Sequence, residues 1–332
     1  MNGISVIICC YNSERTIKRT LEHLSTQNNL QNISWEIIIV DNNCSDKTTE
    51  IVLLFKKEHP KMNIHLVHEP QPGLIFARNM GINTALYDII QFCDDDNFLF
   101  ENYLSTMWNI MQNEKIGACG GKGIAMFDSG TIVPDWFYTI QASYACGEQS
   151  NGTRYVTALY GAGLCVRKSI LSNIKQLGLK YMLTGRNGNL QLSGDDTELC
   201  CFIRKMGFQL YYTPTANFYH CLSSSRLNIE YAQKMFYGFG VAIPVIDLYN
   251  NVFHNYHITY RHLYKQLVKS IRDYYILRLK KRNKNVYRLL DVSVAKGKVN
   301  GYLKFSFKKL IHQYTQFKMI PNYVSKNQTT FT

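Results

Sequence analysis

The amino-acid sequence predicts an α/β protein in which helices cover both faces of a mostly parallel sheet. Short apolar runs rich in β-branched residues, such as residues 5–9 and 36–40, are typical of strands buried on both faces of such a sheet. Helical stretches of about ten or more residues separate successive strands, which indicates right-handed β–α–β crossovers. The chain has 332 residues, enough for one large domain or two smaller ones.

Strands and helices alternate in the first third of the chain. Strands are expected at residues 5–9, 36–40, 64–68 and 89–93, and helices at residues 13–26, 47–58 and around residues 77–79. Ser13 is expected to cap the first helix, because its side-chain oxygen can accept a hydrogen bond from the first turn. Pro70, Pro72 and Gly73 indicate a turn before the third helix.

The pattern is less regular beyond residue 112. A strand-like run leads to Gly161, and a helix is expected to begin at Asp195 and to end before Gly207, a favourable residue just past a helix end. A further strand is expected at residues 209–212, and Pro214 follows it. The chain beyond residue 228 has helical periodicity without a recognisable motif.

Charge is distributed very unevenly along the chain. The net charge is +13, but residues 251–332 alone carry 17 Lys and Arg against two acidic residues. The other 250 residues carry 20 basic and 22 acidic side chains, so a nearly neutral body precedes a strongly basic tail.

The cysteines and the apolar runs indicate the cellular compartment in which the protein is expected. None of the ten cysteines has the spacing of a metal site or a CxxC motif, which favours reduced thiols in a cytosolic protein. No signal peptide is expected ahead of the first strand. No run reaches the roughly 18 to 20 apolar residues that span a bilayer.

Polar side chains follow three of the predicted strands at the point where each strand ends. These are Tyr11 with Asn12, then Asp41, then the run Asp94, Asp95 and Asp96. Ligands of parallel sheets bind at this edge, and three adjacent carboxylates repel one another unless a cation joins them. A divalent cation with phosphate is therefore one interpretation, and a solvated acidic turn is the other. The first strand is followed by no G-x-G-x-x-G and the chain has no P-loop, which excludes those nucleotide-binding classes.

Several motifs, in order and at suitable spacing, resemble the inverting family 2 glycosyltransferases of the GT-A fold. They lie within about residues 3–222 and comprise VIICCYN at 6–12, VDNNCSD at 40–46, Gly73 with Ala77-Arg78-Asn79, FCDDDN at 92–97, GAG at 161–163, GDDTEL at 194–199, and Pro214 with Tyr219-His220. Two departures are Cys9-Cys10, where many relatives have Pro-Thr, and Asp195-Asp196, where Glu-Asp is more usual.

The resemblance implies a domain organisation. Residues 1–227 are expected to form a GT-A catalytic domain with a Rossmann-like, mostly parallel sheet. Within it, residues 1–112 correspond to the half that binds the nucleotide sugar, and residues 113–227 to the acceptor half. Residues 228–332 are expected to form a basic, mostly helical C-terminal region.

On the donor side, the resemblance implies a nucleoside-diphosphate sugar, with a UDP-sugar favoured, and a divalent metal, Mn²⁺ or Mg²⁺. Asp96 would carry the metal, and His220 would be a further ligand or phosphate contact, although a histidine after a strand is as often structural. The remaining contacts to the nucleotide sugar would come from Tyr11, Asp41, Arg78, Asp94 and Asp95. A surface ion pair with an aspartate is the alternative for Arg78.

On the acceptor side, an inverting reaction needs a base opposite the leaving group. The resemblance implies Asp196 in this role, with Asp195 orienting it or contacting the acceptor. The start of a helix would favour the ionised carboxylate. The alternative is that Asp195 caps the helix and Asp196 belongs to its first turn. Gly161, Trp136 and Tyr138 are expected at the acceptor, although the two aromatic residues would equally suit a core.

The basic tail contains one strongly patterned helix. Its apolar residues recur at helical spacing, with Lys265, Lys269 and Arg272 elsewhere on the helix; they are Leu263, Tyr264, Leu267, Val268, Ile271, Tyr274 and Tyr275. Such helices commonly lie on anionic membranes, which predicts a peripheral protein at the inner face of the cell membrane. Packing on the body and an oligomer contact are alternatives, and nucleic acid is not expected because no binding motif accompanies the charge.

The sequence therefore predicts a metal-dependent inverting glycosyltransferase. It would move a sugar to a hydroxyl of a glycan or lipid-linked acceptor in envelope polysaccharide biosynthesis. The alternative is a catalytically silent protein of the same fold that binds a nucleotide or a glycan.

Overall fold

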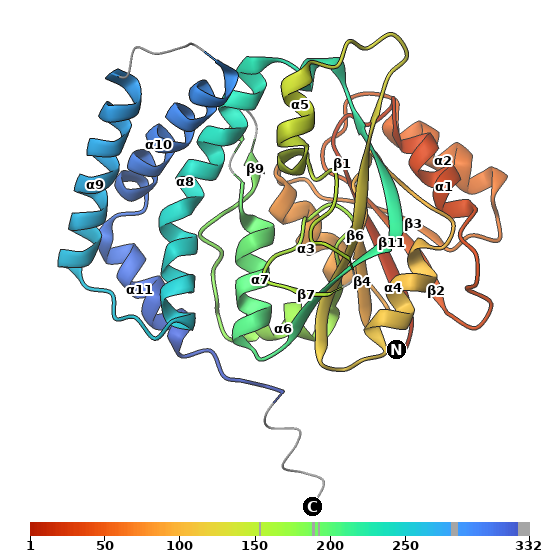
Figure 1. Ribbon diagram of the computed structural model, residues 1–332. Helices are drawn as coiled ribbons and strands as arrows, with labels where there is room; N and C mark the ends of the chain where they lie inside the picture. The colour runs from red at the N-terminus through yellow and green to blue at the C-terminus, as the bar shows by residue number, and fades with distance from the viewer. Residues whose placement is uncertain (153, 188–189, 192, 280–284, 325–332) are drawn as a thin grey trace, which may run out of the picture.

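The computed structural model describes residues 1–324 except 153, 188, 189, 192 and 280–284. A nine-stranded sheet carries helices on both faces, and helices from the C-terminal part of the chain form a further layer on one side (Figure 1). The predicted α/β class with a helical C-terminal extension is confirmed.

The expected strands and helices of the first third of the chain are present in the predicted order, and further elements follow them. In chain order, the elements are β1 (Ile4–Cys10), α1 (Ile17–Ser25), β2 (Trp35–Asp41), α2 (Thr48–Glu58), β3 (Ile64–His68), α3 (Leu74–Thr84), β4 (Ile89–Phe92), β5 (Asn97–Leu99), α4 (Tyr103–Met111), β6 (Ile116–Phe127), α5 (Asp135–Ile140), η1 (Gln141–Tyr144), β7 (Arg154–Val156), β8 (Cys165–Arg167), α6 (Lys168–Gln176), β9 (Arg186–Asn187), β10 (Leu190–Gln191), α7 (Asp195–Lys205), β11 (Gln209–Leu222), η2 (Ser224–Arg226), α8 (Ile229–Phe253), α9 (Tyr260–Leu279), α10 (Val286–Lys304) and α11 (Phe307–Lys318).

The sheet has the strand order β3-β2-β1-β4-β8-β6-β11-β5, and β7 pairs with β11. Strands β1, β2, β3, β4, β6 and β11 run in one direction, whereas β5, β7 and β8 run in the other. The chain therefore winds from β1 outward to β3 and returns to place β4 on the other side of β1. In sheets of this kind, such a reversal opens a crevice at the carboxyl ends of the strands.

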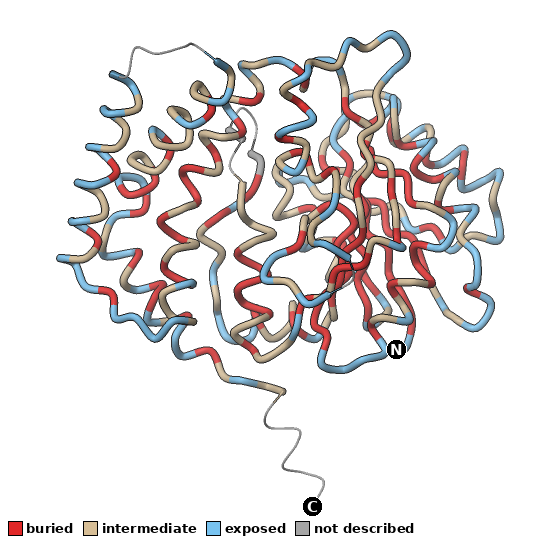
Figure 2. The backbone as a smooth tube through the Cα atoms, viewed as in Figure 1, coloured by how far each residue is buried: buried red, intermediate tan, exposed pale blue. Residues whose placement is uncertain are grey.

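The alternation of side chains along β1 and β2 divides the core between the two faces of the sheet. On β1, Val6 and Ile8 belong to the hydrophobic cluster under α1, α2 and α4, whereas Ile7 belongs to the cluster under α3, α6 and α7. Ile38 and Ile39 of β2 alternate in the same way. Because both faces are covered, these strands are buried along their length (Figure 2).

Three local predictions are wrong. Ser13 does not cap α1, because its hydroxyl bonds to Asp95 and the helix begins after Thr16. The strand-like run before Gly161 is a loop after the short strand β7. Strand β11 continues through Pro214, and its register with β6 shifts between Tyr212 and Asn217, where a missing backbone N–H is tolerated.

The C-terminal helices pack on the body and on each other. Side chains of α8 and α11, including Val245 and Phe317, belong to the same hydrophobic cluster as Phe202 of α7. No helix among the described residues is both long enough and apolar enough to cross a membrane.

Helices α8 and α10 cross at a contact made by glycines. A Cβ atom built on Gly297 would lie 2.2 Å from the carbonyl oxygen of Tyr237, and one built on Gly240 would lie 2.2 Å from that of Val294. These neighbours are backbone atoms of packed helices, so they have little freedom to move aside. The two helices can approach this closely only with glycine at the crossing.

Replacing Gly297 with Val is expected to lower the free energy of unfolding by about 3 kcal/mol, because added methyl groups would force α8 and α10 apart. Lys296→Val, at an exposed position of the same helix, is the matched control for the helix propensity of Val. Chemical denaturation of both variants measures the difference. Equal losses of stability in the two variants would contradict the close crossing.

Candidate active site

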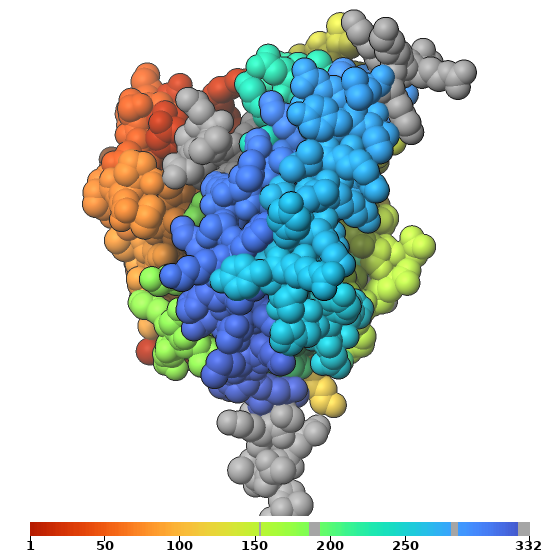
Figure 3. Space-filling view, turned by 90° about the vertical axis from the view of Figure 1, so that its left-hand side faces the viewer, coloured from red at the N-terminus to blue at the C-terminus, as the bar shows by residue number. Residues whose placement is uncertain are grey.

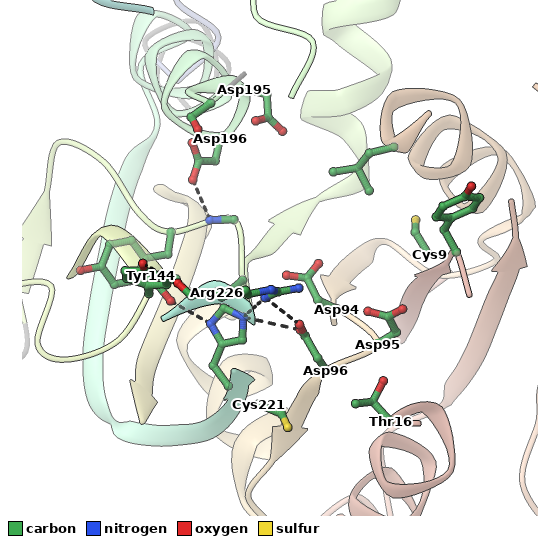
Figure 4. Close-up of a pocket in the computed structure, with 18 of the residues that line it drawn as sticks. Cys9, Thr16, Asp94, Asp95, Asp96, Tyr144, Asp195, Asp196, Cys221 and Arg226 are labelled. Atoms are coloured by element: carbon green, nitrogen blue, oxygen red, sulfur yellow. Dashed lines mark hydrogen bonds and ion pairs between the residues drawn. The ribbon is translucent and has the colours of Figure 1, made fainter. Parts of the chain in front are cut away.

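One cavity of about 1300 Å³ opens at the carboxyl ends of β1 and β4 and extends to the start of α7. Its two acidic groups come from different elements, Asp94 to Asp96 from the end of β4 and Asp195 with Asp196 from α7 (Figure 4). Nine of the predicted site residues line it: Tyr11, Arg78, Asp94, Asp95, Asp96, Gly161, Asp195, Asp196 and His220.

Hydrogen bonds of neighbouring segments hold the aspartate run at the strand end. The Cys93 N–H donates to the carbonyl oxygen of Ile7 on β1 at 3.0 Å. The Thr20 hydroxyl of α1 donates to the carbonyl oxygen of Asp95 at 2.7 Å, and the Ser13 hydroxyl donates to the Asp95 carboxylate. The run is thus a fixed turn between β4 and β5, packed against the start of α1.

Asp96 is buried and faces two cationic partners. Its carboxylate lies 3.1 Å from the Arg226 guanidinium and 3.6 Å from Nε2 of His220. The other ring nitrogen of His220, Nδ1, lies 2.8 Å from the carbonyl oxygen of Tyr144 and is suited to donate to it. Nε2 is therefore the nitrogen that His220 presents to Asp96.

The environment shifts the pKa of two of these groups. Burial raises the pKa of Asp95 to about 7, and the adjacent Asp96 adds to the rise. Burial alone would lower the pKa of His220, but the Asp96 carboxylate beside it raises that pKa to about 10. The Asp96 carboxylate thus raises the pKa of both neighbours, and it favours the protonated form of each.

The chemistry of the donor set fits a divalent ion that shares its ligands with a substrate. Among the residues that the structure describes, no group of three or more His, Cys, Asp and Glu side chains forms a complete metal site. Asp96 and His220 nevertheless present a carboxylate oxygen and an imidazole nitrogen to each other at 3.6 Å. Mg²⁺ and similar ions are usually held by one or two carboxylates together with substrate phosphates and water.

The second acidic group opens helix α7. Gly194 precedes the helix with φ of 100°, a conformation that favours glycine. The Asp196 carboxylate accepts hydrogen bonds from the N–H of Thr197 at 2.7 Å and from the N–H of Gly161 at 3.0 Å. The loop before β8 and the first turn of α7 therefore fix its orientation.

Burial raises the pKa of Asp196, and the charge of Asp195 adds to the rise. The two backbone N–H groups and Arg78 act in the opposite direction but do not cancel it. The hydrogen bond from the helix start thus acts in the expected direction, but burial has the larger effect on the pKa. A carboxylate with a raised pKa is a stronger base, which suits proton removal near neutral pH.

Arg78 connects the two halves of the cavity. Its guanidinium donates to the Asp195 carboxylate at 2.8 Å and lies over the Phe92 ring at 5.3 Å. Only 19% of the Arg78 side chain is exposed, so the pair is not the surface ion pair considered as an alternative. Asp195 does not cap α7 either, because the cap position is Gly194.

Three predicted site residues lie outside the cavity lining. Asp41 accepts the N–H of Cys44 at 2.8 Å and lies 3.3 Å from the His68 ring, so its oxygens already serve the turn after β2. Although burial opposes it, these hydrogen bonds lower the pKa of Asp41. Trp136 packs beside the hydrophobic cluster around Phe137, and Tyr138 is exposed on α5. Their proposed contacts with substrate remain predictions without geometric support.

Several residues of the cavity were not expected from the sequence. Arg226 contacts Asp96, and Ser13 contacts Asp95. Met235 and Phe239 bring helix α8 of the basic region into the cavity wall. The only sequence signal for Arg226 is its position six residues after His220, and nothing in the local pattern marks the others.

Glu198, in the first turn of α7, joins this helix to the loop before it and to helix α8 through hydrogen bonds. Its fully buried carboxylate accepts the N–H groups of Met182 at 3.1 Å and Leu183 at 2.8 Å, and the Tyr249 hydroxyl of α8 also donates to it. Gln313 of α11 donates to the same hydroxyl at 2.9 Å. Burial raises the pKa of Glu198 to about 7. The C-terminal helices therefore help to fix the helix that carries Asp196.

Comparison with known sequences gives a family assignment. The model of the family described as "Glycosyl transferase family 2" matches residues 5–174, which is more than half of the chain. A poly-beta-1,6-N-acetyl-D-glucosamine synthase of Staphylococcus epidermidis is 34% identical over 122 residues, covering 36% of this chain and 28% of the synthase. Glycosyltransferase GlyG of Streptococcus pneumoniae is 32% identical over 111 residues, covering 33% of this chain and 36% of GlyG. The matches thus span about a third of these relatives.

Comparison with solved structures supports the fold over nearly the whole chain. The crystal structure of residues 1–349 of TarS from S. aureus superposes with a TM-score of 0.50 and 15% sequence identity. The superposition covers 99% of this chain and 92% of that one. Together with the family match, it confirms the GT-A fold that the motifs implied.

Proposed function

The chain belongs to glycosyl transferase family 2 and is a glycosyltransferase, and on that premise we propose a metal-dependent inverting transfer from a nucleoside-diphosphate sugar. One observation carries the proposal. A single cavity holds the Asp94–Asp96 run with His220 on one side and Asp196 on the other. Such a cavity can hold a leaving diphosphate and an attacking hydroxyl at the same time.

The end of β4 is the proposed donor site. Asp96 would hold the ion, and His220 would join it through Nε2 once that nitrogen has lost its proton. When bound, the ion neutralises charge on the leaving diphosphate. Arg226 and Arg78 add positive charge beside it, as the ion pairs with Asp96 and Asp195 show. Tyr11, which is 67% exposed at the cavity wall, is suited to pack against the nucleoside. A UDP-sugar is the donor that we favour.

Asp196 is the proposed base. Its Oδ atom would take the proton of the acceptor hydroxyl while that oxygen forms a bond to the anomeric carbon and the bond to the diphosphate oxygen breaks. Attack from the face opposite the leaving group inverts the configuration. The hydrogen bond from Gly161 orients the carboxylate, and its raised pKa favours the proton transfer.

The acceptor is proposed to be a hydroxyl of a glycan or of a lipid-linked glycan in envelope polysaccharide biosynthesis. The names of the relatives support this choice, since one is a synthase of poly-β-1,6-N-acetyl-D-glucosamine. Met235 and Phe239 of α8 supply apolar surface to the cavity. Apolar faces of sugars and lipids pack well against such side chains.

A panel of nucleotide sugars tests the proposal. With Mn²⁺ or Mg²⁺ present, the true donor should raise the melting temperature, because a ligand that binds only the folded protein stabilises it. The same donor should be hydrolysed slowly when no acceptor is present. Stabilisation without turnover by any donor and any glycan acceptor would favour the alternative of a silent binding protein.

A further inference from the structure

Helix α9 is the outermost helix of the C-terminal layer, on the side away from the sheet (Figures 1 and 3). It packs on the molecule through one face, where Leu263 and Ser270 are buried. Leu267 and Tyr274, at the same helical face, are partly covered. The opposite face lies on the surface of the molecule.

Apolar side chains form a continuous stripe along the exposed surface of the helix. They follow one another at intervals of four, four, three, four and four residues, which keeps them on one side of a helix. Their exposures are Tyr260 55%, Tyr264 61%, Val268 47%, Ile271 37%, Tyr275 53% and Leu279 73%. Contiguous exposed apolar surface of this kind marks interaction sites on soluble domains.

A stripe of basic side chains runs beside the apolar one. Each of its four members directly follows a residue of the apolar stripe and is exposed; they are Arg261, Lys265, Lys269 and Arg272. One residue further along an α-helix is a rotation of about 100°, so the two stripes lie side by side. Asp273 is the one acidic residue of α9, and it pairs with Arg272 at 3.1 Å.

We propose that the outer face of α9 rests on the surface of an anionic membrane. The aromatic and aliphatic stripe would enter the boundary between headgroups and acyl chains, and the basic stripe would contact anionic headgroups. Charge complementarity selects this partner over a second copy of the chain. Two copies joined through these faces with antiparallel helices would bring like-charged basic stripes together.

The position of α9 also connects the membrane with the cavity. The Leu277 carbonyl oxygen near the end of α9 accepts a hydrogen bond from Arg288 of α10 at 2.9 Å. Leu290 of α10 packs in the same cluster as Met235 of α8, which lines the cavity. The end of α9 therefore contacts the start of α10, which packs in the same cluster as a residue of the cavity wall. If the proposed function holds, a lipid-linked acceptor would meet the enzyme at this end.

Vesicle sedimentation of the full chain tests the proposal. Phosphatidylcholine vesicles should bind it weakly, and vesicles that also contain phosphatidylglycerol should bind it strongly and less so at high salt. Lys265→Glu with Lys269→Glu should reduce binding at least about tenfold. Val268→Glu with Ile271→Glu should have a similar effect, because it removes the apolar contact.

Helix α2 provides matched controls, since it exposes two adjacent leucines and two adjacent lysines. Leu53→Glu with Leu54→Glu, and Lys56→Glu with Lys57→Glu, make the same chemical changes away from α9 and should leave binding unchanged. Donor hydrolysis measured without vesicles should be the same for the unmodified chain and all variants. If no donor is hydrolysed, the transferase proposal fails, and the vesicle-binding result still tests the membrane proposal.

Three results would overturn the membrane proposal. The first is absence of binding to anionic vesicles by the unmodified chain, and the second is equal loss in the α2 and α9 variants. The third is light scattering that detects a dimer of the unmodified chain and monomers of the α9 variants, which would assign this face to a second copy.

Discussion

Replacing Asp196 with Asn is expected to reduce sugar transfer by about 100- to 10,000-fold, the usual contribution of a general base. The amide cannot take the proton of the acceptor hydroxyl. It is nearly the same size, and its oxygen can still accept the hydrogen bond from Gly161, although the Thr197 N–H then loses its acceptor. The change is confined to the first turn of α7. Donor binding, which depends on the end of β4, should therefore be unchanged.

Initial rates of transfer and calorimetric titration with UDP measure the two expectations separately. Asp135→Asn is the matched control, because Asp135 lies in the first turn of α5 and is exposed. Transfer should also fall as the pH is lowered through the raised pKa of Asp196, since the protonated carboxyl is no base. Near-normal transfer by Asp196→Asn would assign the base to another residue.

The second large effect is expected for Glu198→Ala. The substitution leaves the N–H groups of Met182 and Leu183 and the Tyr249 hydroxyl without their acceptor in the interior. Each buried donor without a partner costs about 1 to 3 kcal/mol, so the free energy of unfolding should fall by at least about 3 kcal/mol. Transfer should fall as well, because the same helix turn carries Asp196.

Denaturant unfolding followed by circular dichroism measures the loss of stability. Glu58→Ala is the control, because Glu58 is an exposed residue at the end of α2 and should change the stability by less than about 0.5 kcal/mol. A loss below about 1 kcal/mol in Glu198→Ala would show that the network does not hold α7 against the C-terminal helices.

The strands and the position of the cavity could be predicted because they depend on local patterns. Continuous β-branched runs determined β1 and β2, and parallel pairing places Cys10 opposite Asp41 and Ile7 opposite Phe92. Once these strands are neighbours, the polar residues that follow them must meet at one edge of the sheet. Asp96 and His220 do lie close together. Local patterns alone did not predict this proximity, which came from the family motifs.

The contacts of individual side chains could not be predicted, because they depend on which distant partners the fold brings close. Asp41 has the sequence context of a ligand, yet the backbone turn that follows β2 occupies its carboxylate. Ser13 stands where a helix cap is expected, yet Asp95, 82 residues further along the chain, takes its hydroxyl. No sequence pattern marks Arg226. The pairing of β11 with β5 brings the segment after β11 close to Asp96, where Arg226 forms its ion pair.

The basic region illustrates the same limit for helices. Leu263 and Tyr264 both belong to the apolar pattern of the sequence, and only the packing of α9 shows that Leu263 is buried and Tyr264 exposed. Periodicity therefore predicted the helix but not the direction of its two faces. The contribution of α8 to the cavity wall could not be predicted either, because periodicity does not show which face of a helix borders a cavity.

Calorimetric titration of UDP with and without Mn²⁺, on the unmodified chain and on Asp96→Asn, tests most directly whether the end of β4 binds a metal and a nucleoside diphosphate together. We predict that the unmodified chain binds UDP much more tightly with Mn²⁺ than with a chelator, and that Asp96→Asn loses this dependence. The Asp96 carboxylate is the proposed ligand, so its amide should not hold the ion. Equal binding of UDP with Mn²⁺ and with chelator, or full Mn²⁺ dependence in Asp96→Asn, would contradict the proposed site.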